Sequence, residues 1–252
     1  MSFIRLFVII TVLYFLQFGV RAQNIAYDIK AGANVGTPYS KPTVNDSGKV
    51  GIGPVLGAFI NYTFSKCFGV HAELSCAYKC ASFQTFISGD TNYPETILGK
   101  PYKIHTQYTG WVKGAFKNYY FDFPVFLAYK ISEKFNLLAG PQISYLLKGK
   151  NTGTADVEVG VNPKYPYTTV DNAPFDESNE LNKWDYSLAC GTSYEATKRL
   201  FLNLTASYGL RSIYKKSYTQ AARKVRNIYL QLSAAFRIGH IKDNPVTENK
   251  TQ

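Results

Sequence analysis

His71, Glu73 and Ser75 are residue types used in hydrolysis, and they alternate along one short segment of the chain. Nucleophilic hydrolysis needs a hydroxyl, a base that takes its proton and an acid that orients the base. In an extended strand, residues two apart share a face but stand about 7 Å apart. A direct contact between His71 and Ser75 would therefore need help from neighbouring strands, so we favour a structural role and expect no enzymatic activity.

The three residues belong to a segment, 68–80, in which apolar and polar side chains alternate without interruption. A period of two is typical of a strand with two different faces. The same alternation recurs in seven further segments, namely 25–34, 51–64, 118–130, 135–148, 184–195, 200–210 and 226–238. The sequence therefore predicts an all-β chain of eight strands.

The connections between these strands alternate in length. Three are very short (65–67, 131–134 and 197–199), and four are long (35–50, 81–117, 149–183 and 211–225). Outer-membrane barrels combine an even strand count with short periplasmic turns and long extracellular loops. The pattern predicts an eight-stranded antiparallel up-and-down transmembrane β-barrel, integral to the cell outer membrane.

The composition of the two faces distinguishes this barrel from a soluble one with an apolar interior. The chain is 15% aromatic, with 20 Tyr and 17 Phe, and the apolar rows contain large residues and end in aromatic ones. The polar rows mix small residues with isolated charges of both signs. Rows of large apolar residues that end in aromatic residues are typical of a lipid-facing band. We therefore expect the small and charged rows to fill the interior, which in eight strands is too narrow for an open pore.

The ends of the chain differ in character from its middle. Arg5, an apolar stretch at 6–16 and the small residues Val20 and Ala22 predict a signal peptide at 1–22, cleaved after Ala22; a retained membrane anchor is the weaker alternative, since the stretch is short for a spanning helix. The barrel domain would be 23–241, and the polar segment 242–252 a disordered periplasmic tail.

The expected interior contains acidic and basic residues that could pair with one another. Buried charges must be paired, and both signs are available. We predict a lumenal charge network made of Asp28, Lys30, His71, Glu73, Lys79, Asp122, Lys130, Asp185, Glu195 and Arg237. The four cysteines, Cys67, Cys76, Cys80 and Cys190, have no metal-ligand spacing and read as isolated thiols, and we expect neither a metal nor a cofactor.

Basic and aromatic residues gather in two of the long connections. Removal of Arg5 and Arg21 with the signal peptide would leave 26 basic against 17 acidic side chains. Because the basic residues form no nucleic-acid motif, we expect outer-membrane lipid and lipopolysaccharide as partners, with a merely solvated surface as the alternative. The candidate extracellular contacts are Lys100, Lys103, Trp111, Lys113, Arg211, Lys215, Lys216, Arg223 and Lys224.

Several motifs resemble those of the PorT-like family of small outer-membrane β-barrels. They are Lys30-Ala31-Gly32-Ala33-Asn34, Phe123-Pro124 with Tyr129-Lys130, Gly140-Pro141 followed by Ser144-Tyr145-Leu146-Leu147, Asp185-Tyr186-Ser187 and Ala206-Ser207-Tyr208-Gly209-Leu210. The resemblance implies an outer-membrane barrel, and the founding member is linked to protein secretion across the outer membrane and attachment at the cell surface. It supplies no catalytic motif.

These observations favour a non-enzymatic interaction or accessory component of the cell envelope, with other envelope or secretion proteins as partners and a link to protein secretion implied by the resemblance. A small channel and a lipid A-modifying enzyme are the alternatives.

Overall fold

The structure, a computed structural model, describes residues 25–40, 47–97, 100–161, 168–218 and 224–241. The predicted signal peptide at 1–22 and the predicted tail at 242–252 lie outside the described residues. Within the described ranges, no helix has the length and apolar character needed to cross a membrane.

Nine strands and one short helix make up the described chain. In chain order they are β1 (Ile25–Tyr39), β2 (Ser47–Thr63), β3 (Phe68–Ile97), β4 (Lys100–Lys130), β5 (Phe135–Val161), β6 (Thr168–Asp176), the 3₁₀ helix η1 (Ser178–Glu180), β7 (Trp184–Glu195), β8 (Leu200–Gly209) and β9 (Arg226–Ile241).

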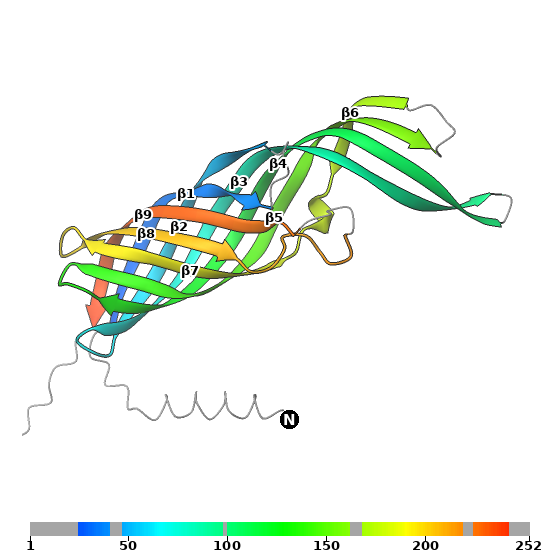
Figure 1. The fold of residues 1–252 in the computed structure, drawn as a ribbon. Helices are drawn as coiled ribbons and strands as arrows, with labels where there is room; N and C mark the ends of the chain where they lie inside the picture. The colour runs from blue at the N-terminus through cyan, green and yellow to red at the C-terminus, as the bar shows by residue number, and fades with distance from the viewer. Residues whose placement is uncertain (1–24, 41–46, 98–99, 162–167, 219–223, 242–252) are drawn as a thin grey trace, which may run out of the picture.

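Eight of these strands close into an antiparallel ring. Hydrogen-bonded neighbours follow the order β4-β3-β2-β1-β9-β8-β7-β5, and β5 pairs again with β4. Closure leaves no open edge within the ring, so its backbone groups are paired without water. The predicted eight-stranded up-and-down barrel is therefore confirmed (Figure 1).

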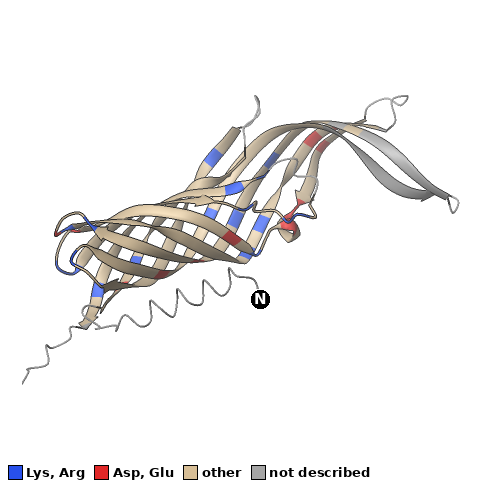
Figure 2. Ribbon diagram, turned by 60° about the horizontal axis from the view of Figure 1, so that its bottom comes forward, with Lys and Arg blue, Asp and Glu red and all other residues tan. Residues whose placement is uncertain are grey.

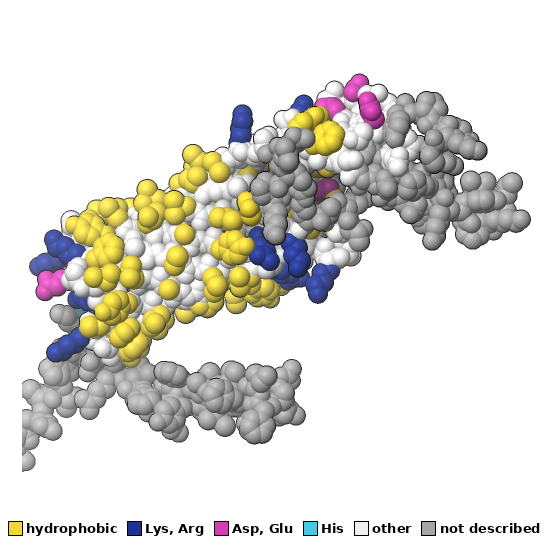
Figure 3. Space-filling view, in the orientation of Figure 1, with side chains coloured by type: hydrophobic (Ala, Val, Ile, Leu, Met, Phe, Trp, Pro, Cys, Tyr) yellow, Lys and Arg dark blue, Asp and Glu magenta, His cyan; other side chains and the backbone are white. Residues whose placement is uncertain are grey.

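The barrel is apolar outside and polar inside. On β3, Leu74 and Cys76 are exposed, whereas Glu73 and Ser75, which alternate with them, are buried. Figure 3 shows hydrophobic side chains covering the barrel wall, with Lys and Arg near both ends of this band. An exposed apolar wall of this extent requires hydrocarbon around it.

Aromatic pairs mark the two ends of the apolar band. Phe68 packs on Tyr129 beside the short turns, with ring centroids 5.1 Å apart, and Tyr78 packs on Tyr119 near the mouth at 4.7 Å. These outward residues of β3 are separated by about the 9 to 11 residues that a tilted strand needs to span a bilayer. They therefore match the two aromatic girdles of a membrane barrel.

Two of the four long connections differ from the sequence prediction, because they are not loops. β3 and β4 stay paired as far as Ile97 and Lys100, and most of 81–117 is therefore strand. β5 also continues beyond the barrel and pairs there with β6, which the sequence did not predict. Hydrogen bonds to a partner strand stabilise these extensions, and a pattern within one segment carries no signal of that partner.

The extensions form one projecting sheet made of β3, β4, β5 and β6 beyond the mouth (Figure 1). β5 changes neighbour on the way out. Its residues Phe135 to Tyr145 pair with β7 in the wall, whereas Thr152 to Val159 pair with β6. The sheet is therefore a direct continuation of the barrel wall.

Candidate functional site

Charged and amide side chains form a chain of contacts across the lumen near the short turns. Arg237 Nε donates to Asp28 Oδ1 at 3.1 Å, and Asn61 Nδ2 donates to Asp28 Oδ2 at 2.9 Å. Asn61 Oδ1 lies 2.8 Å from His71 Nδ1, and because Asn61 Nδ2 donates to Asp28, this amide oxygen accepts from the ring. His71 Nε2 lies 3.6 Å from Glu73 Oε2. The chain joins four strands: β9, β1, β2 and β3.

Glu73 is the centre of this network. Its carboxylate forms an ion pair with Lys30 and accepts a hydrogen bond from Ser75 Oγ at 2.9 Å. The Lys30 and Glu73 side chains are 1% and 6% exposed. A buried charge is tolerated only when it is paired and hydrogen-bonded, and Glu73 meets both conditions.

The same contacts are wrong for nucleophilic hydrolysis. Ser75 donates its proton toward Glu73, and the carboxylate stands between the hydroxyl and the imidazole of His71. Nucleophilic catalysis instead needs the base to contact the hydroxyl and the acid to orient the base. The His71 ring is also enclosed by Phe59 and Phe126, with centroids at 4.4 and 5.6 Å. The geometry therefore favours a structural role.

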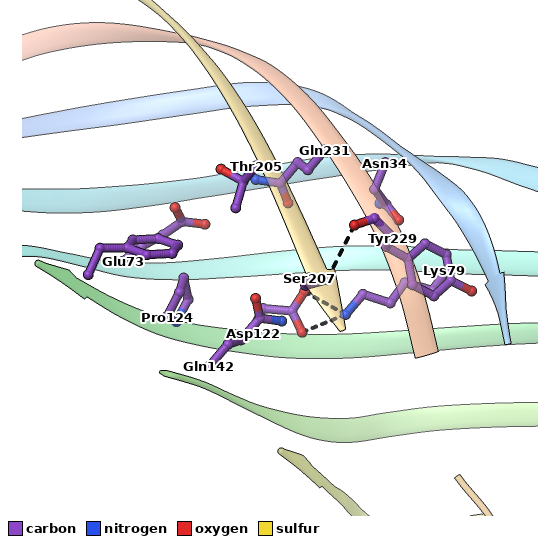
Figure 4. Close-up of a pocket in the computed structure, with 11 residues that line it drawn as sticks. Asn34, Glu73, Lys79, Asp122, Pro124, Gln142, Thr205, Ser207, Tyr229 and Gln231 are labelled. Carbon is purple, nitrogen blue, oxygen red and sulfur yellow. Dashed lines mark hydrogen bonds and ion pairs between the residues drawn. The ribbon is translucent and has the colours of Figure 1, made fainter. Parts of the chain in front are cut away.

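A second ion pair lies closer to the mouth. Lys79 Nζ is 2.9 Å from Asp122 Oδ1 and 2.8 Å from Oδ2. The ammonium group also lies 4.8 Å from the ring centroid of Tyr120 and 5.5 Å from that of Tyr229. Aromatic faces attract cations, most strongly where water is excluded. Lys79 is thus satisfied by one acid and two rings. Figure 4 shows it with Asp122 and Tyr229.

Side chains pack closely in the lumen beside the Lys79 to Asp122 pair. The space beside the Lys79 to Asp122 pair has a volume of about 20 Å³, enough for about one water. Figure 4 shows side chains from strands on several sides of the barrel pointing into this space, among them Glu73, Gln142 and Gln231. The residues that surround it leave no room for a passing solute.

Above the lumen, two chain segments, 177–183 and 211–218, close the mouth. We refer to them together as the cap. Leu181, Ile213 and Tyr214 of the cap are buried against Phe116 and Leu146 of the wall. The two segments are also joined through the backbone, with Asn182 N donating to Ile213 O at 2.7 Å. The cap is therefore a small packed core rather than a pair of solvated loops.

One carboxylate organises the polar part of the cap. Glu177 Oε2 accepts hydrogen bonds from Asn151 Nδ2 at 2.8 Å and from Tyr214 Oη at 3.1 Å, and Glu177 Oε1 accepts one from Tyr218 Oη. Burial and the neighbouring Glu177 raise the pKa of Tyr214 above its ordinary value. Tyr214 therefore keeps its proton and remains a donor at physiological pH.

The predicted lumenal residues are placed as follows. Asp28, Lys30, His71, Glu73, Lys79, Asp122 and Asp185 are buried inside the barrel. Arg237 and Glu195 are only half-buried, near the short turns. Lys130 is exposed, because β4 ends at this residue and its side chain emerges into the turn region. The inclusion of Lys130 in the lumenal network was wrong.

The predicted extracellular contacts fall into two separate regions. Trp111 and Lys113 lie on β4 in the projecting sheet, where Trp111 packs on Phe86 and Lys113 pairs with Asp156 at 3.5 Å. Lys100 and Lys103 lie on the same strand, but their side chains are outside the described part. The sheet therefore holds one of the two basic groups.

The second group belongs to the connection between β8 and β9. Arg211 donates to Asn182 Oδ1 at 3.1 Å, and Lys215 donates to the carbonyl of Asn179. Lys216 and Lys224 are exposed, and Arg223 lies outside the described residues. Arg211, Lys215 and Lys216 thus belong to the cap itself.

Several residues of the site could not be recognised from alternation alone. Asn61, Tyr120 and Tyr229 complete the two ion networks, yet neutral residues on a polar face give no sign of a charged partner. Glu177 and Tyr214 lie in connections that have no period. The one sequence feature that could have indicated them is the pair of tyrosines, Tyr214 and Tyr218. In the described ranges, no cluster of His, Cys, Asp or Glu could hold a metal ion.

Comparison with known proteins adds a family match. The family described as outer membrane protein β-barrel domain matches residues 21–215. The search of curated proteins finds no match.

Similar solved structures include Ail of Yersinia pestis in complex with the heparin analogue sucrose octasulfate (13% identity, 85% of this chain and 97% of that chain, TM-score 0.38). They also include OprG of Pseudomonas aeruginosa (11% identity, 88% and 97%, TM-score 0.36) and the protease OmpT of Escherichia coli (10% identity, 86% and 97%, TM-score 0.31).

Proposed function

We propose a function from one premise: this chain belongs to the outer membrane protein β-barrel domain family and is an integral outer-membrane protein. We infer that it acts without catalysis, as an interaction component of the cell envelope. One observation carries the proposal: the barrel interior is filled and capped, while β3 to β6 extend a paired sheet beyond the mouth.

The filled interior argues against transport and catalysis. Two ion networks and a cavity of about 20 Å³ occupy the lumen, and the apolar core of the cap lies above them. A conducting pore needs a continuous wet path, which these side chains interrupt. The hydroxyl of Ser75 is buried and hydrogen-bonded to a carboxylate rather than to a base. Partner binding is therefore better supported than a channel or a lipid A-modifying enzyme.

The projecting sheet has the properties of a binding surface. Its ladders hold it in one conformation, which lowers the entropy cost of binding. Phe86 and Trp111 pack edge to face with centroids 5.3 Å apart, and Lys113 and Asp156 lie nearby in paired strands. Aromatic residues bordered by charges are typical of protein interfaces. The resemblance to PorT-like barrels adds the finer proposal that the partner is a component of protein secretion.

Trimming the sheet would test this function. Gln84 and Lys113 are register partners, so replacing 85–112 by Asn-Gly would close the β3–β4 hairpin with a two-residue turn. We expect this variant to reach the outer membrane and to keep heat-modifiable mobility on SDS gels. It should lose the envelope proteins that the tagged full-length protein retains after cross-linking. A Lys66→Gln variant at a short turn is the control.

The secretion link needs a cellular readout. Cells lacking the gene, complemented with the full-length or trimmed chain, would be compared by their secreted and surface proteomes. We expect only the full-length chain to restore them. Full restoration by the trimmed chain would contradict the proposal, and ion conductance in planar bilayers or altered lipid A acylation would support the alternatives instead.

A further inference from the structure

A row of small side chains crosses the outer wall of the barrel. Ala139 on β5 is the register partner of Cys190 on β7, and Cys190 is the register partner of Ala206 on β8. Larger apolar residues border this row, among them Leu188 and Leu230. The result is a groove of about 660 Å³ that is lined almost entirely by apolar atoms.

The groove runs down the apolar band from its extracellular side to Ala139, the fifth residue of β5. It includes Tyr208, the residue before the last of β8, and Ile228, the third residue of β9. Both positions are close to the mouth, where the outer leaflet surrounds the barrel. The occupant of the groove must therefore be apolar and reach it from that leaflet.

A cation is fixed at the rim of the groove. The Tyr208 ring lines the groove, and its hydroxyl accepts a hydrogen bond from Arg226 Nη1 at 2.8 Å. The Arg226 guanidinium carbon lies 5.8 Å from the centroid of the same ring. Arg226 Nε is shielded from solvent and has no hydrogen-bond partner among the described residues. Arg226 is thus held at the boundary between groove and water, with Nη1 on Tyr208 and Nε enclosed.

More positive charge lies around this position. Lys224, two residues before β9, and Arg211, two residues after β8, are both exposed. The described stretches 207–218 and 224–230 contain no Asp or Glu. Figure 3 shows Lys and Arg side chains gathered at this end of the hydrophobic band. The rim would therefore attract a fixed anion at the level of the head groups.

We propose that this surface binds one phosphorylated glycolipid of the lipid A type from the outer leaflet. One acyl chain lies in the groove over Ala139, Cys190 and Ala206, and a sugar phosphate contacts Arg226 and Lys224. A phosphate accepts the forked donors of a guanidinium well. The combination of groove and cation separates this site from the rest of the apolar wall, which contacts lipid without charge selection.

Titration of the purified full-length chain with diphosphoryl lipid A in detergent, followed by native mass spectrometry, would test the proposal. We expect one retained lipid. R226Q with K224Q should weaken binding about tenfold or more, because each lost head-group charge costs roughly a fivefold factor. The charge control is Lys134→Gln in a short turn, which should bind like the parent chain.

The groove is tested separately. Ala206→Phe and Cys190→Phe would each fill it, whereas Ala72→Phe adds the same bulk to the outer face of β3. Heat-modifiable mobility identifies the variants that fold. We expect both groove variants to lose most of the binding and the β3 control to keep it.

Three results would overturn the proposal. Equal binding of all variants would show that the lipid is not held here. If only the charge variants lost lipid binding, the head group alone would be recognised, and the groove would hold no acyl chain. Equal retention of phosphatidylglycerol would replace a glycolipid site by nonselective attraction of anionic lipid.

Discussion

The lumen and the cap are both closed interiors, but different contacts dominate in each. The lumen is organised by ion pairs such as Lys30 with Glu73 and Lys79 with Asp122. The cap is organised by apolar packing of Leu181, Ile213 and Tyr214. β4 passes through both regions, placing Asp122 in the lumen and Phe116 under the cap. One strand therefore changes the chemistry of its inward face over six residues, or three periods of the alternation.

The surroundings explain this difference. In the bilayer, apolar side chains are satisfied by lipid, so large apolar residues can remain outside and the interior can be polar. Beyond the head groups water returns, and burial of apolar surface again drives packing. Figure 2 shows charged positions along the barrel strands as well as at the turns. Apolar packing is therefore confined to small clusters beside the lumenal ions, such as Phe126 with Leu138, and becomes the main contact in the cap.

Breaking one lumenal ion pair should have the largest effect. Glu73→Leu leaves Lys30 buried without its acid, and loss of one partner of a buried pair costs about 3–5 kcal/mol. Urea unfolding in detergent should show a lower midpoint, whereas Glu158→Leu on the exposed sheet should leave it unchanged. An unchanged midpoint for Glu73→Leu would contradict the network.

The double variant E73L with K30M sharpens this test. Removing both charges leaves no unpaired ion, so much of the lost stability should return. If the double variant were as unstable as Glu73→Leu alone, lost packing rather than an unpaired charge would be the cause.

A cavity in the cap should have a smaller and local effect. Leu181 is 3% exposed, and Leu→Ala in a packed core costs about 2–5 kcal/mol, with the low end expected in a core this small. Hydrogen exchange should become faster in 177–183 and 211–218 while the barrel strands keep their protection. Leu210→Ala, an exposed position, is the matched control. Faster exchange throughout the barrel would mean that the cap and the lumen are one cooperative unit.

The tyrosine of the cap predicts a weaker effect that depends on pH. Tyr214→Phe removes the donor to Glu177 and should cost about 1 kcal/mol near neutral pH. Because burial raises the pKa of Tyr214 above the ordinary value of 10.0, the folded cap binds this proton more tightly than the unfolded one. The stability of the cap should therefore hold below pH 10 and fall above it.

Hydrogen exchange of the cap across this pH range, corrected for the intrinsic rate, would measure the loss. Above pH 10, the stability of the cap should decline less steeply in Tyr214→Phe than in the parent chain. Identical profiles for the parent and the variant would show that Tyr214 does not carry the dependence.

The exposed pair on the sheet should show the smallest effect. Lys113 Nζ lies 3.5 Å from Asp156 Oδ2, with the two side chains 55% and 33% exposed. The backbone N–H of Asn172 also lowers the pKa of Asp156, so this carboxylate stays ionised without the lysine. Lys113→Gln should therefore cause no measurable change in the urea midpoint. A clear loss would show that the sheet depends on charge as the lumen does.

Alternation predicted the eight wall strands because each has two different environments. It failed where both faces meet water. The β3–β4 extension and β6 depend on hydrogen bonds to partner strands. In β6, Pro174 and Asn172, which has a positive φ of 53°, are also residue types that do not favour a regular strand.

The interior was only partly predictable for a related reason. Alternation places Lys30 and Glu73 inside, but they lie on β1 and β3, and only the barrel geometry brings them together across β2. The contribution of Asn61 was missed because it is neutral, and Lys130 was misplaced because a strand end releases its side chain. The cap was missed entirely because its contacts join 177–183 to 211–218 without any repeating pattern.

The unbroken pairing of β3, β4 and β5 from the wall into the sheet has a mechanical consequence. A partner pulling outward on the tip would load these strands along their length, so the force would act in shear on many hydrogen bonds at once. It would not peel them apart one by one. Such a pull would be resisted by the whole bilayer-embedded ring rather than by one strand at a time.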